Sequence, residues 1–379
     1  MSPSAEARRD PLPGAHALDA WERAAVRLIP GRRRAAVSRR PPTRARQSLQ
    51  GTEGPRDGAR EPGRPPAAGR GPEGVRRSRS AEEHRRQSRG ALLRLVRPWQ
   101  WSKNLVVFAA PFTAGVLDRL GALGAALGAF VAFSAVASGV YCLNDVLDAR
   151  RDRLHDIKRM RPVASGMVSP ARATLLGLAL IWAGLVDAWV VGGAGLFGTL
   201  GSYAALSVAY SVTLKRIPLV ELACVATGFV LRAVAGGIAV HVGLSAWFLL
   251  VVSFGSLMVA SGKRSAEHLA LGPARRHFRH VLKHYSLSRL RAIRRIAAGG
   301  TLACFVMWAF LGLNPVSSRH HGSGWAEIAI IPFVIGTVRL ERRFSAGAGE
   351  EPERLFYSDR VLEVCGFILA VLIAVAVYG

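Results

Sequence analysis

A dense group of charged side chains follows a long apolar run, in the stretch from Leu143 to Gly166, LNDVLDARRDRLHDIKRMRPVASG. Asp145, Asp148 and Asp152 stand at positions i, i+3 and i+7, so a helix would place their carboxylates on one face. Asn144 adds a neutral oxygen or amide donor one turn before Asp148. Mg²⁺ prefers oxygen ligands and commonly keeps waters and substrate phosphates in its shell. The three carboxylates are therefore predicted to bind a divalent metal and to act in catalysis on a diphosphate.

Basic side chains just downstream suit the same chemistry. Lys158, Arg159 and Arg161 are candidates for holding phosphates that a metal would bridge. The alternative is a solvated helix end whose acids only pair with neighbouring arginines, but it explains neither Asn144 nor the shared acidic face. Asp156 lies where a loop is expected to begin, and it is left out of the predicted site.

A second polar group begins with Tyr210 and Lys215 and continues in a helix that Pro218 should start. Glu221 lies in the first turns of that helix, and Arg232 lies some three turns deeper. A cation in the middle of a membrane span is costly unless it meets an anion or a polar cavity, so Arg232 should point inward and bind substrate. The alternative is an internal salt bridge from Arg232 to Glu221 or to an acid of the first stretch.

The third polar group is the sequence SGKRSAE, in which Lys263 and Arg264 close an apolar block. Phosphate binding and the general preference of basic residues for the cytoplasmic face explain these two residues equally well. Three histidines further on, His277, His280 and His284, have helical spacing but no carboxylates nearby. We expect them to face lipid headgroups and not a metal.

The distribution of apolar residues predicts the scaffold that holds these groups, an all-α polytopic membrane protein. Half of the 379 residues are hydrophobic, and they arrive in blocks of about membrane-spanning length. Gly236 and Gly237 predict close helix packing in one block. The four cysteines show no CxxC spacing, which argues against a zinc site or a disulfide framework. Nine spans are expected, at about residues 104–118, 121–142, 172–191, 194–212, 218–240, 244–262, 293–313, 325–340 and 360–378.

Every second connection between these nine blocks is rich in basic residues. The connections after the second, fourth, sixth and eighth blocks are rich in Lys and Arg, whereas the others are nearly free of them. By the positive-inside rule the basic connections face the cytoplasm, so the N-terminus lies inside and the C-terminus outside. All three polar groups then lie on the cytoplasmic side of the cell (plasma) membrane.

Residues 1–90 differ in composition from the expected membrane domain, residues 91–379. The first 100 residues carry 23 Arg and 10 acids, which is half of the net charge of +26. With few aliphatic residues and much Arg, Pro and Gly, residues 1–90 are expected to form a disordered tail. A basic tail attracted to anionic lipid is one role, and a dispensable extension is the favoured alternative. The charge therefore does not indicate binding of nucleic acid.

At these residues the chain resembles the UbiA superfamily of intramembrane transferases, whose first signature, NDxxDxxxD, stands here as Asn144, Asp145, Asp148 and Asp152. Further stretches, such as RPWQWSKNLVVFAAP and YSVTLKRIPLVELACVATGFVLRAVAGG, are similar to its phosphoribosyltransferase branch. The resemblance spans about residues 94–379. It implies nine transmembrane helices around a central cytoplasm-facing cavity and a dependence on Mg²⁺, with Lys103 also among the substrate-binding residues.

The activity implied by this resemblance is transfer of a 5-phosphoribosyl group from phosphoribosyl diphosphate to decaprenyl phosphate, or another polyprenyl phosphate, in the synthesis of a cell-wall arabinan precursor. A homo-oligomer, a trimer, is implied by the resemblance alone. Members that use prenyl diphosphates carry a second motif, DxxxD, but here Glu221 is followed four residues later by Val225. Two alternatives stay open, which are an aromatic or quinone prenyltransferase of the same fold and a non-enzymatic transporter or lipid-binding protein.

Overall fold

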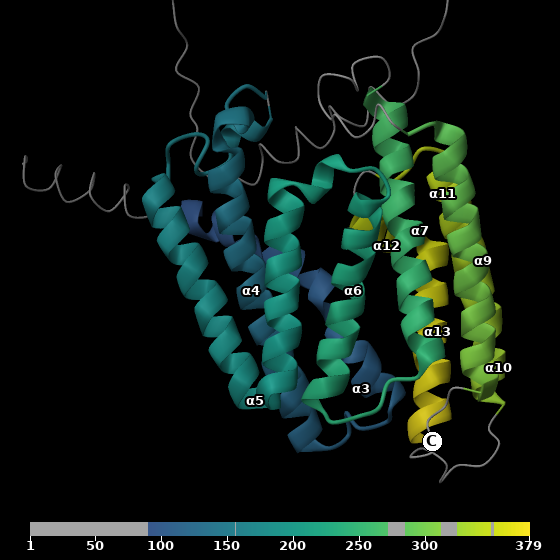
Figure 1. Cartoon of the computed structure of the whole chain (residues 1–379). Helices are drawn as coiled ribbons and strands as arrows, with labels where there is room; N and C mark the ends of the chain where they lie inside the picture. Colours follow the sequence, from purple (N-terminus) through teal and green to yellow (C-terminus); the bar gives the residue numbers. More distant parts are fainter. Residues whose placement is uncertain (1–89, 156, 272–284, 312–323, 350–351) are drawn as a thin grey trace, which may run out of the picture. The chain divides into compact units, whose positions relative to one another are not determined.

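Helices make up almost all of the regular structure in the computed structural model, and no strand occurs in the part of the chain that it describes. That part comprises residues 90–155, 157–271, 285–311, 324–349 and 352–379. The expected all-helical fold is confirmed for these residues. Residues 1–89 of the expected tail and the three histidines between 277 and 284 lie outside them. A short helix at residues 90–96 precedes the labelled elements of Figure 1.

In the part of the chain that the structure describes, six helices are long and apolar enough to cross a membrane. Their apolar side chains remain exposed over much of their length, as lipid-facing residues would be. Neighbours in the sequence pack against each other, α4 with α5, α5 with α6, and α6 with α7, while α9 packs on α7 (Figure 1). The six are α4 (Leu120–Asp152), α5 (Pro170–Val212), α6 (Val220–Ala239), α7 (Ala246–Leu271), α9 (Leu287–Leu311) and α13 (Arg360–Tyr378).

Helix α5 is broken in the middle of its 43 residues. A straight helix of that length would extend about 65 Å, roughly twice the hydrocarbon thickness of a bilayer. Gly192 and Gly193 have non-helical backbone angles, and Gly193 takes a φ of 60°, which a residue with a side chain rarely adopts. The break lies between the two apolar blocks expected at residues 172–191 and 194–212. The sequence GGAG therefore joins two helical segments without any charged residue.

The first expected span differs from a regular α-helix. The chain instead forms the 3₁₀-helix η1 (Pro98–Phe108) and the short helix α3 (Ala109–Thr113). In a 3₁₀-helix residues three apart lie on one face, so Trp101, Asn104 and Val107 face the same way. Trp101 Nε1 donates to Ser138 Oγ at 3.0 Å, and Asn104 Nδ2 donates to Ser134 Oγ at 3.0 Å. These bonds hold η1 against α4.

Close backbone contacts set the distance between several helices. A side chain on Gly236 of α6 would collide with the backbone carbonyl of Val107, so only glycine lets η1 and α6 approach this closely. A side chain on Gly139 of α4 would likewise meet the backbone carbonyl of Gly177 of α5. The expectation of close helix packing at Gly236 is confirmed, as small residues at such crossings allow dense van der Waals contact.

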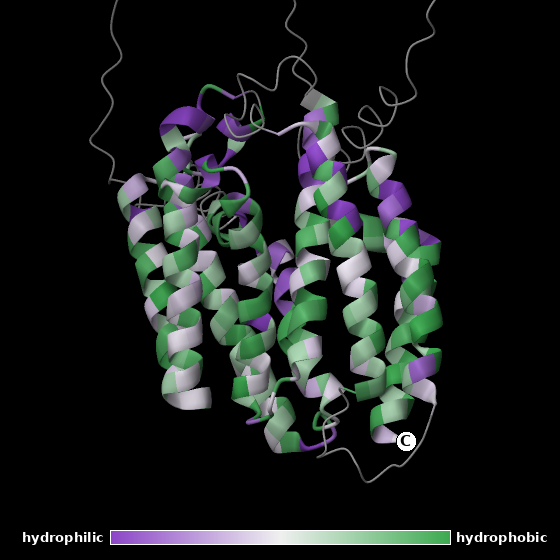
Figure 2. Cartoon of the chain, turned by 45° about the vertical axis from the view of Figure 1, so that its right-hand side comes forward, coloured by the Kyte–Doolittle hydropathy of each residue, from purple (hydrophilic) through white to green (hydrophobic). Residues whose placement is uncertain are grey.

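Three shorter α-helices lie in the last third of the chain, α10 (Trp325–Ile328), α11 (Ile330–Ser345) and α12 (Pro352–Ser358). The 3₁₀ turns η2 (Lys158–Met160) and η3 (Leu214–Arg216) follow α4 and α5. Figure 2 shows most hydrophilic residues gathered at the end of the helices away from the C-terminus. The end of α4, the start of α6 and the end of α7 all lie on that side (Figure 1).

Candidate active site

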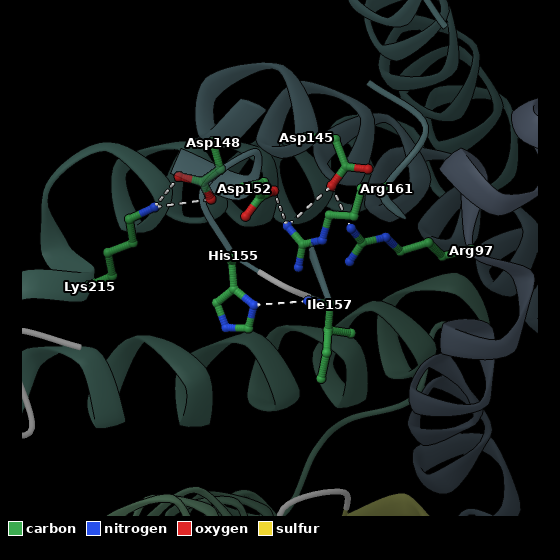
Figure 3. Close-up of polar contacts among 8 residues, drawn as sticks. All are labelled: Arg97, Asp145, Asp148, Asp152, His155, Ile157, Arg161 and Lys215. Atoms are coloured by element: carbon green, nitrogen blue, oxygen red, sulfur yellow. Dashed lines mark hydrogen bonds and ion pairs between the residues drawn. The ribbon is translucent and has the colours of Figure 1, made fainter. Parts of the chain in front are cut away.

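The acidic stretch lies in the last turns of α4, as its spacing predicted. Asp152 is the final residue of the helix, and Asp145 lies two turns earlier. Asp145 and Asp152 are buried, whereas Asp148 is partly exposed. Each of the three carboxylates contacts a basic side chain from outside α4 (Figure 3). The geometry thus combines an acidic helix end with its own set of counter-cations.

Arg97 is the partner of Asp145. Its Nη2 donates to Asp145 Oδ1, and its guanidinium lies over the ring of Tyr141 at 5.3 Å. Arg97 has a left-handed backbone, φ 55° and ψ 59°, immediately before Pro98, which disfavours helical angles in the residue that precedes it. Backbone strain of this kind persists where surrounding contacts over-determine it, and it concentrates at functional sites.

Arg161 bridges the two buried acids of α4. Its Nη1 lies 2.7 Å from Asp152 Oδ2 and 3.5 Å from Asp145 Oδ1. The turn η2 and the connection that follows it return the chain toward α4, where Arg153 Nε donates to the carbonyl of Ala164 at 3.2 Å. Arg161, predicted to hold a phosphate, therefore points at the acids it was expected to assist (Figure 3).

Lys215 connects the first polar group with the second. From η3 its Nζ donates to Asp148 Oδ1 at 3.0 Å, with Oδ2 at 3.4 Å. The two residues are 67 positions apart, so the packing of α5 against α4 brings them together. Two groups that the sequence placed on the same side of the membrane thus form one continuous polar surface.

Glu221 and Arg264 form a buried ion pair that links the second group with the third. Arg264 Nε donates to Glu221 Oε1 at 2.9 Å, and its Nη2 donates to the hydroxyl of Tyr210 at 3.3 Å. Glu267, one turn after Arg264, accepts from Nη1 at 2.8 Å. Burial raises the pKa of the nearby Tyr285 phenol above its ordinary value. The structure therefore assigns Arg264 a pairing role that the sequence had left undecided.

Arg232 is buried on α6 without a carboxylate partner among the described residues. Its guanidinium donates from Nε to Asn104 Oδ1 at 2.8 Å and from Nη1 to the carbonyl of Gly228 at 2.7 Å. It also donates to the hydroxyl of Tyr203 at 3.1 Å and lies 4.8 Å above the ring of Phe133. The alternative of a salt bridge to Glu221 is wrong. Amide, carbonyl and aromatic groups hold the charge instead.

The other predicted site residues lie around this surface. Lys103 Nζ donates to Gln100 Oε1 at 2.6 Å within η1. Lys158 and Arg159 belong to η2 and are exposed, and Lys263 lies on α7 next to Arg264. Asp156, which was left out of the prediction, lies outside the described residues. The role of these basic residues in substrate binding stays a prediction.

The oxygen atoms at the end of α4 suit a hard divalent cation. Asn144 Oδ1 and Asp145 Oδ2 are buried and have no hydrogen-bond partner in the described part of the chain, which is unusual for such atoms. Mg²⁺ needs only one or two carboxylates from a protein when phosphates and waters complete its shell. The three aspartates do not converge, however, and the described residues contain no group of three or more metal-binding side chains. Asp145 with Asn144 is thus the part of the predicted face that fits a metal.

Sequence reasoning missed two arginines that the structure makes prominent. Arg97 belongs to the interfacial segment RPW, and its position before a proline was the available signal. Arg294 of α9 is fully buried and reaches three side chains. These are Glu341 at 2.7 Å, Ser345 at 2.9 Å and Ser265 at 3.0 Å. It ties α7, α9 and α11 together, and within a run of basic residues nothing distinguished it.

Known proteins resemble this chain over most of its length. The sequence profile of the UbiA prenyltransferase family matches residues 105–369. The decaprenyl-phosphate phosphoribosyltransferase of Corynebacterium glutamicum is 36% identical over 292 residues, covering 76% of this chain and 86% of that protein. The protein of the same name from Mycobacterium tuberculosis is 37% identical over 280 residues, covering 72% and 89%.

Solved structures show the same fold. A UbiA homologue from Archaeoglobus fulgidus bound to GPP and Mg²⁺ has a TM-score of 0.57 and 19% identity, covering 76% of this chain and 99% of that one. The same homologue bound to DMAPP and Mg²⁺ gives a TM-score of 0.57 as well. With its apolar helices and the family match over residues 105–369, this chain is a multi-pass membrane protein that belongs to the UbiA prenyltransferase family.

Proposed function

We propose that the chain transfers the 5-phosphoribosyl group of phosphoribosyl diphosphate to decaprenyl phosphate, or a closely similar polyprenyl phosphate, and releases diphosphate. The observation that carries this proposal is the match to decaprenyl-phosphate phosphoribosyltransferases at 36–37% identity over about three quarters of the chain. The acidic end of α4, surrounded by three basic side chains, supplies the charges that a metal-diphosphate substrate requires.

The reaction does not require the protein to remove a proton from the acceptor. The acceptor is a phosphate oxygen that is already anionic at neutral pH, so no strong general base is needed. The barrier comes from the departing diphosphate and from positive charge that develops on the ribosyl C1. When bound, Mg²⁺ would stabilise the leaving diphosphate by Lewis-acid catalysis. Asp145 and Asn144 would hold it, and the remaining carboxylates would favour the oxocarbenium-like carbon.

Basic side chains at the site would hold the substrates' phosphates. Arg97, Arg161 and Lys215 already reach the acidic end of α4 and are free of competing carboxylates elsewhere in the described residues. When the donor binds, these three side chains would exchange their ion pairs with the carboxylates for ion pairs with the donor's phosphates. Direct displacement by the acceptor predicts inversion at C1, and hence a β-linked product from an α donor.

The membrane topology belongs to the same proposal. Nine spans follow if α5 counts as two, and if η1 with α3 and α10 with α11 cross as shorter segments. The positive-inside rule supports an N-terminus and an acidic site on the cytoplasmic side of the plasma membrane, a C-terminus outside, and a central cavity open to the cytoplasm. A role in cell-wall arabinan synthesis, a trimeric assembly and a disordered tail before residue 91 stay predictions from the sequence and the resemblance.

An aromatic or quinone prenyltransferase is the second candidate, because solved UbiA homologues of this fold carry the prenyl diphosphates GPP and DMAPP. The region where a second acidic motif would stand has only Glu221, and Arg264 occupies that carboxylate. A second acidic site is therefore missing at this position, which favours the phosphoribosyl donor.

The test is transfer of label from radioactive phosphoribosyl diphosphate into lipid by membranes that contain the full-length chain and decaprenyl phosphate. We expect Mg²⁺-dependent labelling, and a loss of at least a hundredfold in Asp145→Asn. Glu363→Gln, at an acid in the first turn of α13 and outside the site, is the matched control and should retain activity. Product from GPP and an aromatic acid, with none from phosphoribosyl diphosphate, would establish the second candidate.

A further inference from the structure

An apolar groove lies between α6, α7 and α9. It has a volume of about 470 Å³ and is open on one side. Its walls are mainly apolar, with two hydroxyl groups, of Thr227 and Ser253, and nothing in the acidic site accounts for it. Its main apolar lining residues are Leu219 just before α6, Ala223 and Val230 of α6, Phe254 and Leu257 of α7, and Ile293 of α9.

The wall provided by α6 follows one face of that helix over two turns. Ala223, Ala226 and Val230 stand at i, i+3 and i+7, which is the spacing of one helix face, and Leu219 lies just before the helix begins. With a rise of 1.5 Å per residue, this helical wall extends for about 11 Å. Small side chains occupy its middle, and Ala223 is exposed. The groove therefore has the length and the narrow, hollowed form that suits a hydrocarbon chain.

One end of the groove is basic and lies close to the acidic site. Leu219, its first residue, comes four positions after Lys215, which contacts Asp148 at 3.0 Å. Arg216 lies between them and is exposed. On α9, Arg289 precedes Ile293 by one helical turn, on the same face and nearer the charged end, and is also exposed. An occupant with an anionic head and an apolar tail would match both parts.

We propose that this groove binds the isoprene units of the acceptor lipid nearest its phosphate, while the phosphate lies at the basic end beside Lys215. The inference rests on the proposed function and specifies where the acceptor lies. The charge complementarity favours an anionic polyprenyl chain, and the continuity from the groove to Lys215 brings the head to the acids of α4. A membrane phospholipid or a second copy of the chain would cover the groove without placing a phosphate beside Lys215.

Photolabelling tests the location directly. The full-length protein in phosphatidylethanolamine nanodiscs is irradiated with a decaprenyl phosphate that carries a diazirine in the isoprene units nearest the phosphate. We expect label on residues 219–230, in and just before α6, or on residues 254–257 of α7. Excess decaprenyl phosphate should remove this label, and phosphatidylglycerol should not. Label confined to other helices, or equal displacement by phosphatidylglycerol, would overturn the proposal.

Kinetics of a filled groove give an independent test. Ala223→Trp places a large side chain in the groove, and because Ala223 is exposed the helix can accommodate it. We expect the KM for decaprenyl phosphate to rise at least tenfold, while the KM for phosphoribosyl diphosphate stays unchanged. Val220→Trp, at an exposed residue of α6 outside the groove lining, should change the KM for decaprenyl phosphate less than twofold.

Other results separate the groove from the proposed function. An unchanged KM for decaprenyl phosphate in Ala223→Trp, or a change only in oligomer size, would overturn the inference. If the parent enzyme transfers no label to any acceptor, the proposed function fails. Photolabelling still decides in that case whether the groove binds a polyprenyl phosphate.

Discussion

The buried ion pair of Arg264 and Glu221 allows a structural role to be separated from substrate binding. Arg264 Nε and Glu221 Oε1 are 2.9 Å apart, and the two side chains are 5% and 0% exposed. Removing one member of a buried pair leaves the other charge uncompensated, which destabilises a protein by about 3–5 kcal/mol. We expect a loss of that size in Arg264→Met, because no other cation in the described ranges pairs with Glu221.

Two further variants test the reasoning behind this magnitude. In Glu221→Gln, Arg264 would keep Glu267 at 2.8 Å and Tyr210 at 3.3 Å, so the expected loss is only about 1–3 kcal/mol. The double variant Glu221→Leu with Arg264→Met removes both charges and replaces them with apolar groups. It should recover most of the stability that Arg264→Met loses.

The protein carries its own reporter for this measurement. Cys142, Cys224 and Cys304 are buried free thiols, so a thiol-reactive dye reports their exposure as the detergent-solubilised protein unfolds with temperature. A lower unfolding temperature with an unchanged KM for phosphoribosyl diphosphate would support a structural pair. An unchanged unfolding temperature with a KM raised tenfold or more would refute it and make Arg264 a substrate ligand.

Two other substitutions test the helix packing, each against a neighbour. Gly236→Ala would drive a methyl group into the Val107 carbonyl and should lower stability by about 1–3 kcal/mol, whereas Gly237→Ala meets only the flexible end of a leucine and should be milder in the same thermal assay. Arg294→Met should destabilise the protein by about 3–5 kcal/mol, because it leaves a carboxylate and two hydroxyls without their donor. Arg295→Met, at an exposed position, should have almost no effect, and equal losses in both variants would contradict a specific clamp.

The local features of the fold were accessible from the sequence. Apolar blocks of spanning length predicted helices, and the carboxylates of Asp145, Asp148 and Asp152 lie on α4 because their spacing follows the helical period. The separate apolar blocks at residues 172–191 and 194–212 predicted the interruption of α5, and glycine tolerates the left-handed angles found there at Gly193. These features depend on residues close together in the chain.

Long-range partners could not be predicted in the same way. The contact of Arg232 with Asn104 spans 128 residues, and it depends on how far η1 rotates against α6. Hydropathy gives the length of a span but not the direction in which each side chain points at a neighbouring helix. The 3₁₀ form of η1 could not be predicted for a related reason, because the hydrogen bonds of Trp101 and Asn104 to α4 suit a three-residue repeat.

The pairing of three acids with three cations also has a thermodynamic consequence. Asp145, Asp148 and Asp152 are balanced by Arg97, Arg161 and Lys215, so the formal charges of these six side chains sum to zero. A divalent cation that binds the carboxylates alone would leave the basic side chains without an anionic partner. A diphosphate that binds the basic side chains alone would leave the carboxylates without a cationic partner. When both ligands bind, every charged group has a partner of opposite charge. Metal and donor are therefore expected to bind cooperatively, each raising the other's affinity by the same factor.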